Sequence, residues 1–143
     1  MALTKAQLVT RVRTMTARTD VDTQILQFLN DALKRAARYH TWRDLMTEKN
    51  ATLTVGTYRY SFPSDMKECL GVRIIDSASS VWLQEISQVR MDAFEPYPPS
   101  RGNARPAYYA VDGNYLELFP PPDSAYETRI RYSRWPAELS ADA

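Results

Sequence analysis

The hydrophobic pattern of this chain changes period near Ala51, and that change decides which elements the chain can form. Before it, apolar residues recur three or four places apart, as in Leu8, Val12 and Met15, which predicts amphipathic helix. After it, apolar and polar residues alternate, as in "YRYSF", which predicts half-buried strands. A helical part therefore precedes a β part, and the predicted fold class is α+β.

Two helices are predicted, and together they form an N-terminal helical hairpin or bundle. The first spans Lys5–Ala17, where Thr4 serves as N-cap and Gln7 completes a capping box. The second spans Thr23–His40, with Asp22 or Asp20 as its N-cap. Its apolar residues are expected on one side, at Ile25, Leu29, Ala32, Ala36 and Tyr39. Its polar residues are expected on the outer face, at Asn30, Asp31, Lys34, Arg35 and Arg38.

About seven short strands are predicted after the helices. Three hairpins are expected, in which residues 51–55 pair with 58–62, 69–75 with 81–86, and 107–111 with 115–119. A short helical turn around 87–94 and a last strand at 126–135 complete the pattern. Closely spaced turns between short strands favour an antiparallel β-sandwich or a partly open barrel.

The predicted domain organisation has three parts within one compact unit. The helical part covers residues 1–50, the β domain covers 51–136, and 137–143 starts a C-terminal extension. The β domain contains a long proline-rich loop near 95–106. A chain of 143 residues that is 44% hydrophobic can bury a core without a metal or a disulfide.

The residues that usually carry catalysis are scarce in this sequence. His40 is the single histidine and Cys69 the single cysteine, and the four glycines form no phosphate-binding loop. His40 is better explained as a helix-end residue near Trp42, and Cys69 as a buried residue of an apolar strand. We therefore expect no enzyme, no cofactor and no metal site.

Charge and hydropathy limit the possible partners. Lysine and arginine number 18 against 17 acids, so a nucleic-acid contact would have to be local. No stretch approaches the roughly 20 apolar residues that cross a bilayer, so we expect the chain to be made in the cytoplasm and to contact no membrane. A nucleic-acid-binding module that acts as a monomer remains an alternative, and a steep salt dependence of its DNA affinity would identify it.

Scattered residues recur in a recognisable order from about Leu8 to Pro136. They are Asn30, Trp42-x-x-Leu45, Tyr60-x-Phe62-Pro63-x-Asp65, Pro106-x-x-Tyr109, Leu116-x-Leu118-x-Pro120, Ile130-x-Tyr132 and Pro136. In this order they resemble the head-to-tail adaptor proteins of tailed bacteriophages, the group that includes the tail tubular protein A type of short-tailed phages.

The resemblance implies a structural, non-catalytic role in the virion, at the junction of head and tail. It implies a ring of twelve copies beneath the portal protein, which extends the DNA channel and gives tail or nozzle proteins a platform. The partners implied are other copies of the chain, the portal protein, tail proteins and genome DNA in the channel. It also implies further C-terminal helices that dock on the portal, and residues 137–143 are expected to begin that extension.

Two candidate contact sites are predicted for such an adaptor. The helix face with Lys34, Arg35 and Arg38 is expected to contact the portal or the channel. The loop is expected to contact the tail or a neighbouring copy, through Pro96, Tyr97, Pro98, Pro99, Arg101 and Arg105. In a crowded ring, exposed strand edges could pair with strands of a neighbouring copy. We hypothesise that such pairing is prevented by Pro63, by the run Pro120–Pro122 and by the arginines of the last strand.

Overall fold

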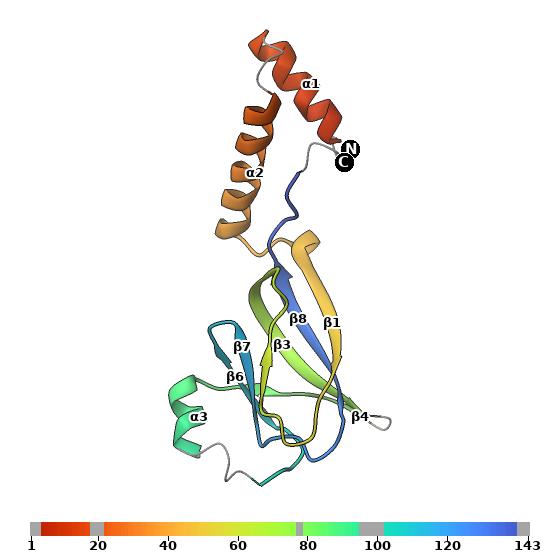
Figure 1. Ribbon diagram of the computed structural model, residues 1–143, viewed down its shortest axis with the longest axis vertical. Coiled ribbons are helices and arrows are strands. Elements are labelled where there is room, and N and C mark those ends of the chain that lie inside the picture. Colours follow the sequence, from red (N-terminus) through yellow and green to blue (C-terminus); the bar gives the residue numbers. More distant parts are fainter. Residues whose placement is uncertain (1–3, 18–21, 77–78, 95–101, 140–143) are drawn as a thin grey trace. The chain divides into compact units, whose positions relative to one another are not determined.

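The chain divides into two compact units, which are described separately. The computed structural model describes residues 4–17, 22–76, 79–94 and 102–139. One unit is helical and comprises Met1–Arg43 together with Trp135–Ala143, and the other, the β unit, comprises Asp44–Arg134. Figure 1 shows the elements of both. The predicted α+β class is confirmed.

The helical unit contains α1 (Lys5–Thr16) and α2 (Asp22–Tyr39). The predicted capping box of α1 is confirmed, because the Thr4 amide donates to Gln7 Oε1 at 2.9 Å and the Gln7 amide donates to Thr4 Oγ1 at 3.3 Å. Both helices end within a residue or two of their predicted limits. The alternative N-cap Asp20 lies outside the described residues.

The buried side of α2 is narrower than the sequence predicts. Among the described residues of the helical unit, only Ile25 and Ala37 are buried. Ala32, Ala36 and Tyr39 were expected on the buried side and are exposed instead. The prediction was wrong for these three because apolar residues cover more of the circumference of α2 than its contacts within this unit can bury.

The described part of the β unit contains eight strands, which form two four-stranded sheets. The strands are β1 (Met46–Thr52), β2 (Arg59–Ser61), β3 (Met66–Asp76), β4 (Ser79–Trp82), β5 (Gln84–Glu85), β6 (Tyr108–Asp112), β7 (Tyr115–Phe119) and β8 (Glu127–Arg134). The first sheet has the order β1-β8-β3-β4 and is antiparallel, whereas the second has the order β2-β7-β6-β5 and its β5 runs parallel to β6. The sheets do not close into a barrel. Two short helical segments, Arg43–Leu45 (η1) and α3 (Gln88–Phe94), accompany them, and α3 lies beside β6 (Figure 1).

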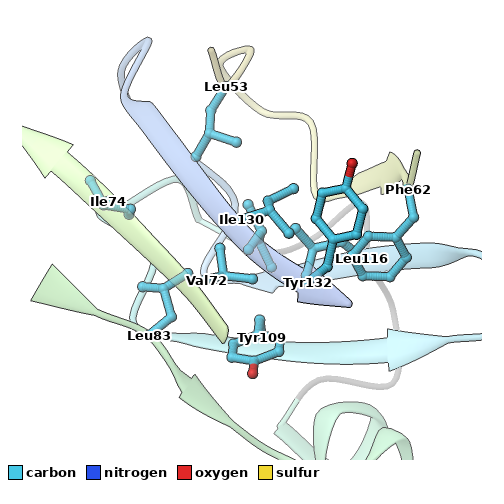
Figure 2. Close-up of a cluster of buried hydrophobic side chains, with 10 residues drawn as sticks. Leu53, Phe62, Val72, Ile74, Leu83, Tyr109, Leu116, Ile130 and Tyr132 are labelled. Atoms are coloured by element: carbon cyan, nitrogen blue, oxygen red, sulfur yellow. The ribbon is translucent and has the colours of Figure 1, made fainter. Parts of the chain in front are cut away.

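One hydrophobic core joins the two sheets of the β unit, which gives the sandwich architecture. Its members from the first sheet are Val72, Ile74, Ile130 and Tyr132, and those from the second are Tyr109, Leu116 and Leu118. Leu53, Phe62 and Leu83 come from the ends of strands and from connections. Figure 2 shows these side chains gathered between the strands. The alternation of Thr128, Ile130 and Tyr132, all buried, is the period-two pattern that the sequence displays in β8.

Two of the three predicted hairpins are confirmed. β3 pairs with β4, and β6 pairs with β7 across the turn at Gly113, whose φ is 56°. The first predicted hairpin is wrong, because β1 pairs with β8 and β2 pairs with β7. Gly56 does make a turn, with a φ of 75°, but this turn connects the two sheets. Leu53 enters the core just before it, which carries the chain from one sheet to the other.

The hypothesis of proline and arginine at open edges is wrong for the last two strands. β7 lies between β2 and β6, and β8 lies between β1 and β3. Pro121 and Pro122 are buried, and their carbonyls accept hydrogen bonds from the amides of Ala104 and Gly56, each at 2.8 Å. The proline run is therefore packed inside the unit. Pro63 does follow an edge strand, β2.

Candidate interaction surfaces

The segment that follows β8 is bound to α2 by side chains of the helix. The Asn30 amide group makes two hydrogen bonds to the backbone of Leu139: Nδ2 donates to the carbonyl at 3.2 Å, and the Leu139 amide donates to Oδ1 at 2.8 Å. One helical turn on, Lys34 Nζ lies 2.6 Å from Glu138 Oε1. Asn30 and Lys34, expected on the outer face, are therefore partly covered. The sequence prediction missed this because the segment is 109 residues away in the chain.

The ion pair of Lys34 with Glu138 and the hydrogen bonds of Asn30 contribute differently to holding this segment on α2. The hydrogen bond and charge of Glu138 raise the pKa of Lys34, and the hydrogen bond from Lys34 lowers the pKa of Glu138. Both groups are solvated, so the ion pair adds little stability. The Asn30 amide instead matches one donor and one acceptor of a single backbone residue. It therefore fixes the register of the segment on the helix.

The structure separates the three cations that the sequence grouped together. Lys34 and Arg38 line a hollow of about 270 Å³ with Trp135. Arg35 lines a different hollow, of about 290 Å³. Lys34 and Arg38 are brought together with an indole, a combination that suits carboxylates or phosphates.

Most of the predicted tail-contact loop lies outside the described residues, namely Pro96, Tyr97, Pro98, Pro99 and Arg101. Arg105 is placed by contacts in the β unit. Its Nη2 donates to Ser79 Oγ at 3.2 Å, and its Nη1 lies 4.0 Å from Asp76 Oδ2. Arg105 therefore attaches the C-terminal end of the loop to the hairpin of β3 and β4.

An arginine and tryptophan cluster occupies the outer face of the first sheet. Trp82 is opposite Arg73 in the register of β3 and β4, and its side chain is 49% exposed. The guanidinium carbons of Arg73 and Arg131 lie 5.5 and 5.4 Å from the centre of the indole. Tryptophan and arginine are the residues most often found at the energetic centres of protein interfaces. This Arg–Trp face is thus a further candidate contact surface, in addition to the two that the sequence predicts.

Glu48 on β1 balances part of the positive charge of the Arg–Trp face. Its Oε1 lies 2.6 Å from Arg131 Nη2, and its Oε2 lies 3.4 Å from Arg129 Nη1. The hydrogen bond from Arg131 lowers the pKa of the Glu48 carboxyl. The alternating arginines of β8 were visible in the sequence. Their neighbours on β1 and β4 were not, since these depend on the strand register.

Gly71 makes room for the Trp82 indole, which yields a testable prediction. A Cβ at Gly71, whose φ is 155°, would lie 2.9 Å from Trp82 Cζ3. We expect Gly71→Ala to push the indole off the sheet and to lower the free energy of unfolding by roughly 1–2 kcal/mol. Urea unfolding of the two proteins measures this loss. Gly102→Ala is the control, because nothing lies within 4 Å of a Cβ there; equal losses in the two variants would contradict the packing role.

The groups on these surfaces are suited to contacts with other molecules. Among the described residues, no three carboxylate, thiol or imidazole groups are close enough to hold a metal ion. Within the same ranges, no helix has the length and apolar character needed to cross a membrane. The Asn30 amide that holds the segment after β8, the cationic hollow and the exposed Arg–Trp face are features suited to binding.

A comparison with known protein families identifies the family of this chain. The family model of the SU10 adaptor protein matches residues 3–143, and the chain belongs to that family. It is therefore a phage adaptor of the head–tail type, a structural component of the virion. The wider resemblance found in the sequence is confirmed, whereas membership of the tail tubular protein A group stays a prediction. No match was found among curated proteins.

Proposed function

We propose that this protein assembles as a ring of twelve copies beneath the portal, extends the DNA channel and gives tail or nozzle proteins their attachment site. The family supports an adaptor role. The observation that carries the proposal further is the thin core of the helical unit. Ile25 and Ala37 are the only buried hydrophobic residues in its described part.

A unit with so little buried apolar surface gains little stability from its own core. Its larger apolar side chains remain outside, with Met15 at 76% and Tyr39 at 90% exposure. Exposed apolar surface of this kind marks a contact with other proteins. In a closed ring each copy presents two different surfaces to its neighbours, and the contact is repeated until the rotation closes. Assembly would then supply the packing that the unit lacks.

The two predicted contact sites take separate roles in this proposal. The hollow of Lys34, Arg38 and Trp135 faces the portal or the channel, where acidic side chains or DNA phosphates meet its cations. Arg35, on the other hollow, shares this role. The loop of residues 96–105 contacts the tail or a neighbouring copy.

Tailless heads that carry the portal provide the test. The purified protein should bind them, and electron microscopy and mass measurement should show one ring per portal. Arg38→Glu should weaken head binding at least tenfold, since it reverses one of the two charges of the hollow. Lys49→Glu, an exposed reversal in the β unit, is the control and should bind normally.

Two outcomes would contradict the proposed function. Heads that receive only single, unconnected copies would exclude the ring. Failure to bind heads, combined with DNA affinity that falls steeply with salt, would favour the monomeric nucleic-acid-binding alternative. Deletion of residues 96–104 tests the loop separately from head binding, because heads should then acquire the ring but not the tail.

A further inference from the structure

An exposed apolar stripe runs along α2 on the side that the helical unit leaves uncovered. It consists of Phe28, Ala32, Ala36 and Tyr39, with Phe28 exposed by 73%. The spacing of four, four and three residues keeps all of them on one face of the helix. Beyond this run, the Trp42 indole donates from Nε1 to the Ala36 carbonyl at 2.9 Å. The stripe is continuous, and alanines occupy its middle.

Two opposite charges, Asp31 and Arg35, lie along one side of this stripe. Their order allows the same face of a second helix to match it when that helix runs the other way. Asp31 precedes Ala32, and Arg35 precedes Ala36, and all four side chains are exposed. Read from the other end of the helix, an aromatic residue, an alanine and a charge of opposite sign recur in nearly the same places. This pattern therefore favours two identical helices that run in opposite directions.

We propose that α2 pairs antiparallel with α2 of a second copy, forming a dimer of the unassembled protein. Each of the following contacts would occur twice across the two-fold axis: Phe28 with Tyr39, Asp31 with Arg35, and Ala32 with Ala36. A parallel pair in register would place like residues, and so like charges, side by side. The small alanines at the crossing allow the helix axes to approach to about 8 Å.

The surface beside Ala32 has the shape that such packing needs. A hollow of about 290 Å³ is lined by Phe28, Asp31, Ala32 and Arg35. Residues at this spacing, i, i+3, i+4 and i+7, form the hole that receives one side chain of a facing helix in knobs-into-holes packing. The hollow therefore fits a side chain from a second helix.

The size of the stripe sets the strength of the dimer. Aromatic side chains bury about 150–250 Å² each, and the proposed contact has four of them. With the alanines and charges, the total reaches the lower end of what specific interfaces bury, about 1,200 Å². The expected dimer is weak and depends on concentration, so that its subunits can separate before they join another assembly.

This dimer goes beyond the proposed ring and does not depend on it. A ring uses two different surfaces on each copy, whereas the stripe on α2 is complementary to itself and closes after two copies. The dimer would cover the exposed aromatic residues of α2 while the protein is unassembled. The dimer can therefore be measured without heads, and a failure of head binding would not contradict the proposed dimer.

Charge reversal tests the pairing in the purified full-length chain. Sedimentation at low salt should show a monomer–dimer equilibrium over micromolar concentrations. Asp31→Arg and Arg35→Asp should each weaken the dimer at least tenfold, and an equal mixture of the two variants should restore it as a heterodimer. Asp92→Arg, an exposed reversal on α3 in the β unit, is the control and should dimerise like the original chain.

Cysteine cross-linking tests the direction of the helices in a Cys69→Ser background. Ala32→Cys mixed with Ala36→Cys should form a mixed disulfide. Either variant alone should not, because like positions lie about 6 Å apart along an antiparallel axis. Self-cross-linking of each single variant would show parallel helices and overturn the proposal. A monomer at all concentrations, or a dimer unaffected by both charge reversals, would overturn it as well.

Discussion

Leu118→Ala should lower the free energy of unfolding of the β unit by about 3 kcal/mol. Leu118 is fully buried on β7, in the core that joins the two sheets. Its loss leaves a cavity that the surroundings cannot readily fill, since hydrogen bonds to β2 and β6 hold the strand on both sides. For a unit of this size the same loss should lower Tm by more than about 10 °C.

The measurement needs a signal that belongs to the β unit, because a chain of two units need not unfold in one step. Methyl resonances of the core, followed through urea unfolding, provide it. Val89→Ala is the control: it also truncates an aliphatic side chain of the β unit, but one that is 80% exposed on α3. Its effect should stay within about 0.5 kcal/mol. Similar losses in both variants would contradict the assignment of the core.

Features that depend on neighbouring residues in the chain could be predicted from the sequence. The capping box of Thr4 and Gln7, the Asp-Gly turn before β7 and the buried alternation of β8 each involve a few consecutive residues. Their physical causes are local, namely hydrogen bonding at a helix start, positive φ and the pleat of a strand. Together these features were enough to give the α+β class.

Features that depend on distant partners could not be predicted. β1 was expected to pair with its neighbour in sequence, but β8 offers it seven residue pairs, including Glu48 opposite Arg131. The Arg–Trp face depends on that register and on Gly71 making room for Trp82. The period of α2 likewise identifies its apolar residues but not how many of them a neighbour covers.

The candidate contact surface on α2 also combines features that the sequence predicts with features that depend on distant residues. The sequence found the cations Lys34, Arg35 and Arg38, but not that the first is paired with Glu138 and that the third shares a hollow with Trp135. Asn30 belonged to the pattern that resembles the adaptor family, and no role could be given to it. The structure supplies that role, because only a distant backbone segment reveals what the amide binds.

Asn30→Ala should release residues 135–139 from α2. The substitution removes both hydrogen bonds to Leu139 and leaves its amide and carbonyl without their partner. We expect a cost of about 1–2 kcal/mol to the helical unit, because each of the two partly buried hydrogen bonds contributes about 0.5–1.5 kcal/mol. Amide exchange at Leu139 should accelerate accordingly. Gln27→Ala controls for the higher helix propensity of alanine, since Gln27 is an exposed residue of the same helix.

Asn30→Asp separates the hydrogen bonds of Asn30 from the ion pair nearby. At neutral pH one oxygen of the introduced carboxylate would still accept from the Leu139 amide, but the other would face the Leu139 carbonyl and repel it. The protonated acid could keep the first bond and also donate a hydrogen bond to the carbonyl. The pKa of the introduced carboxyl should therefore be raised in the folded protein, above the usual value of about 3.9 for an aspartate. Its stabilising contribution is complete below the unfolded-state pKa and disappears as the pH rises through the folded-state pKa.

The pair of Lys34 and Glu138 has the opposite pH dependence, and that contrast makes the experiment decisive. Because the pKa of Glu138 is lowered, the contribution of this pair is present above its unfolded-state pKa and disappears as the pH falls through the folded-state value. Every variant shares that loss in acid. Only Asn30→Asp should regain protection at Leu139 relative to Asn30→Ala as the pH falls. Parallel pH profiles for the two variants would mean that the segment is held by the ion pair, and that the amide of Asn30 has no part in fixing it.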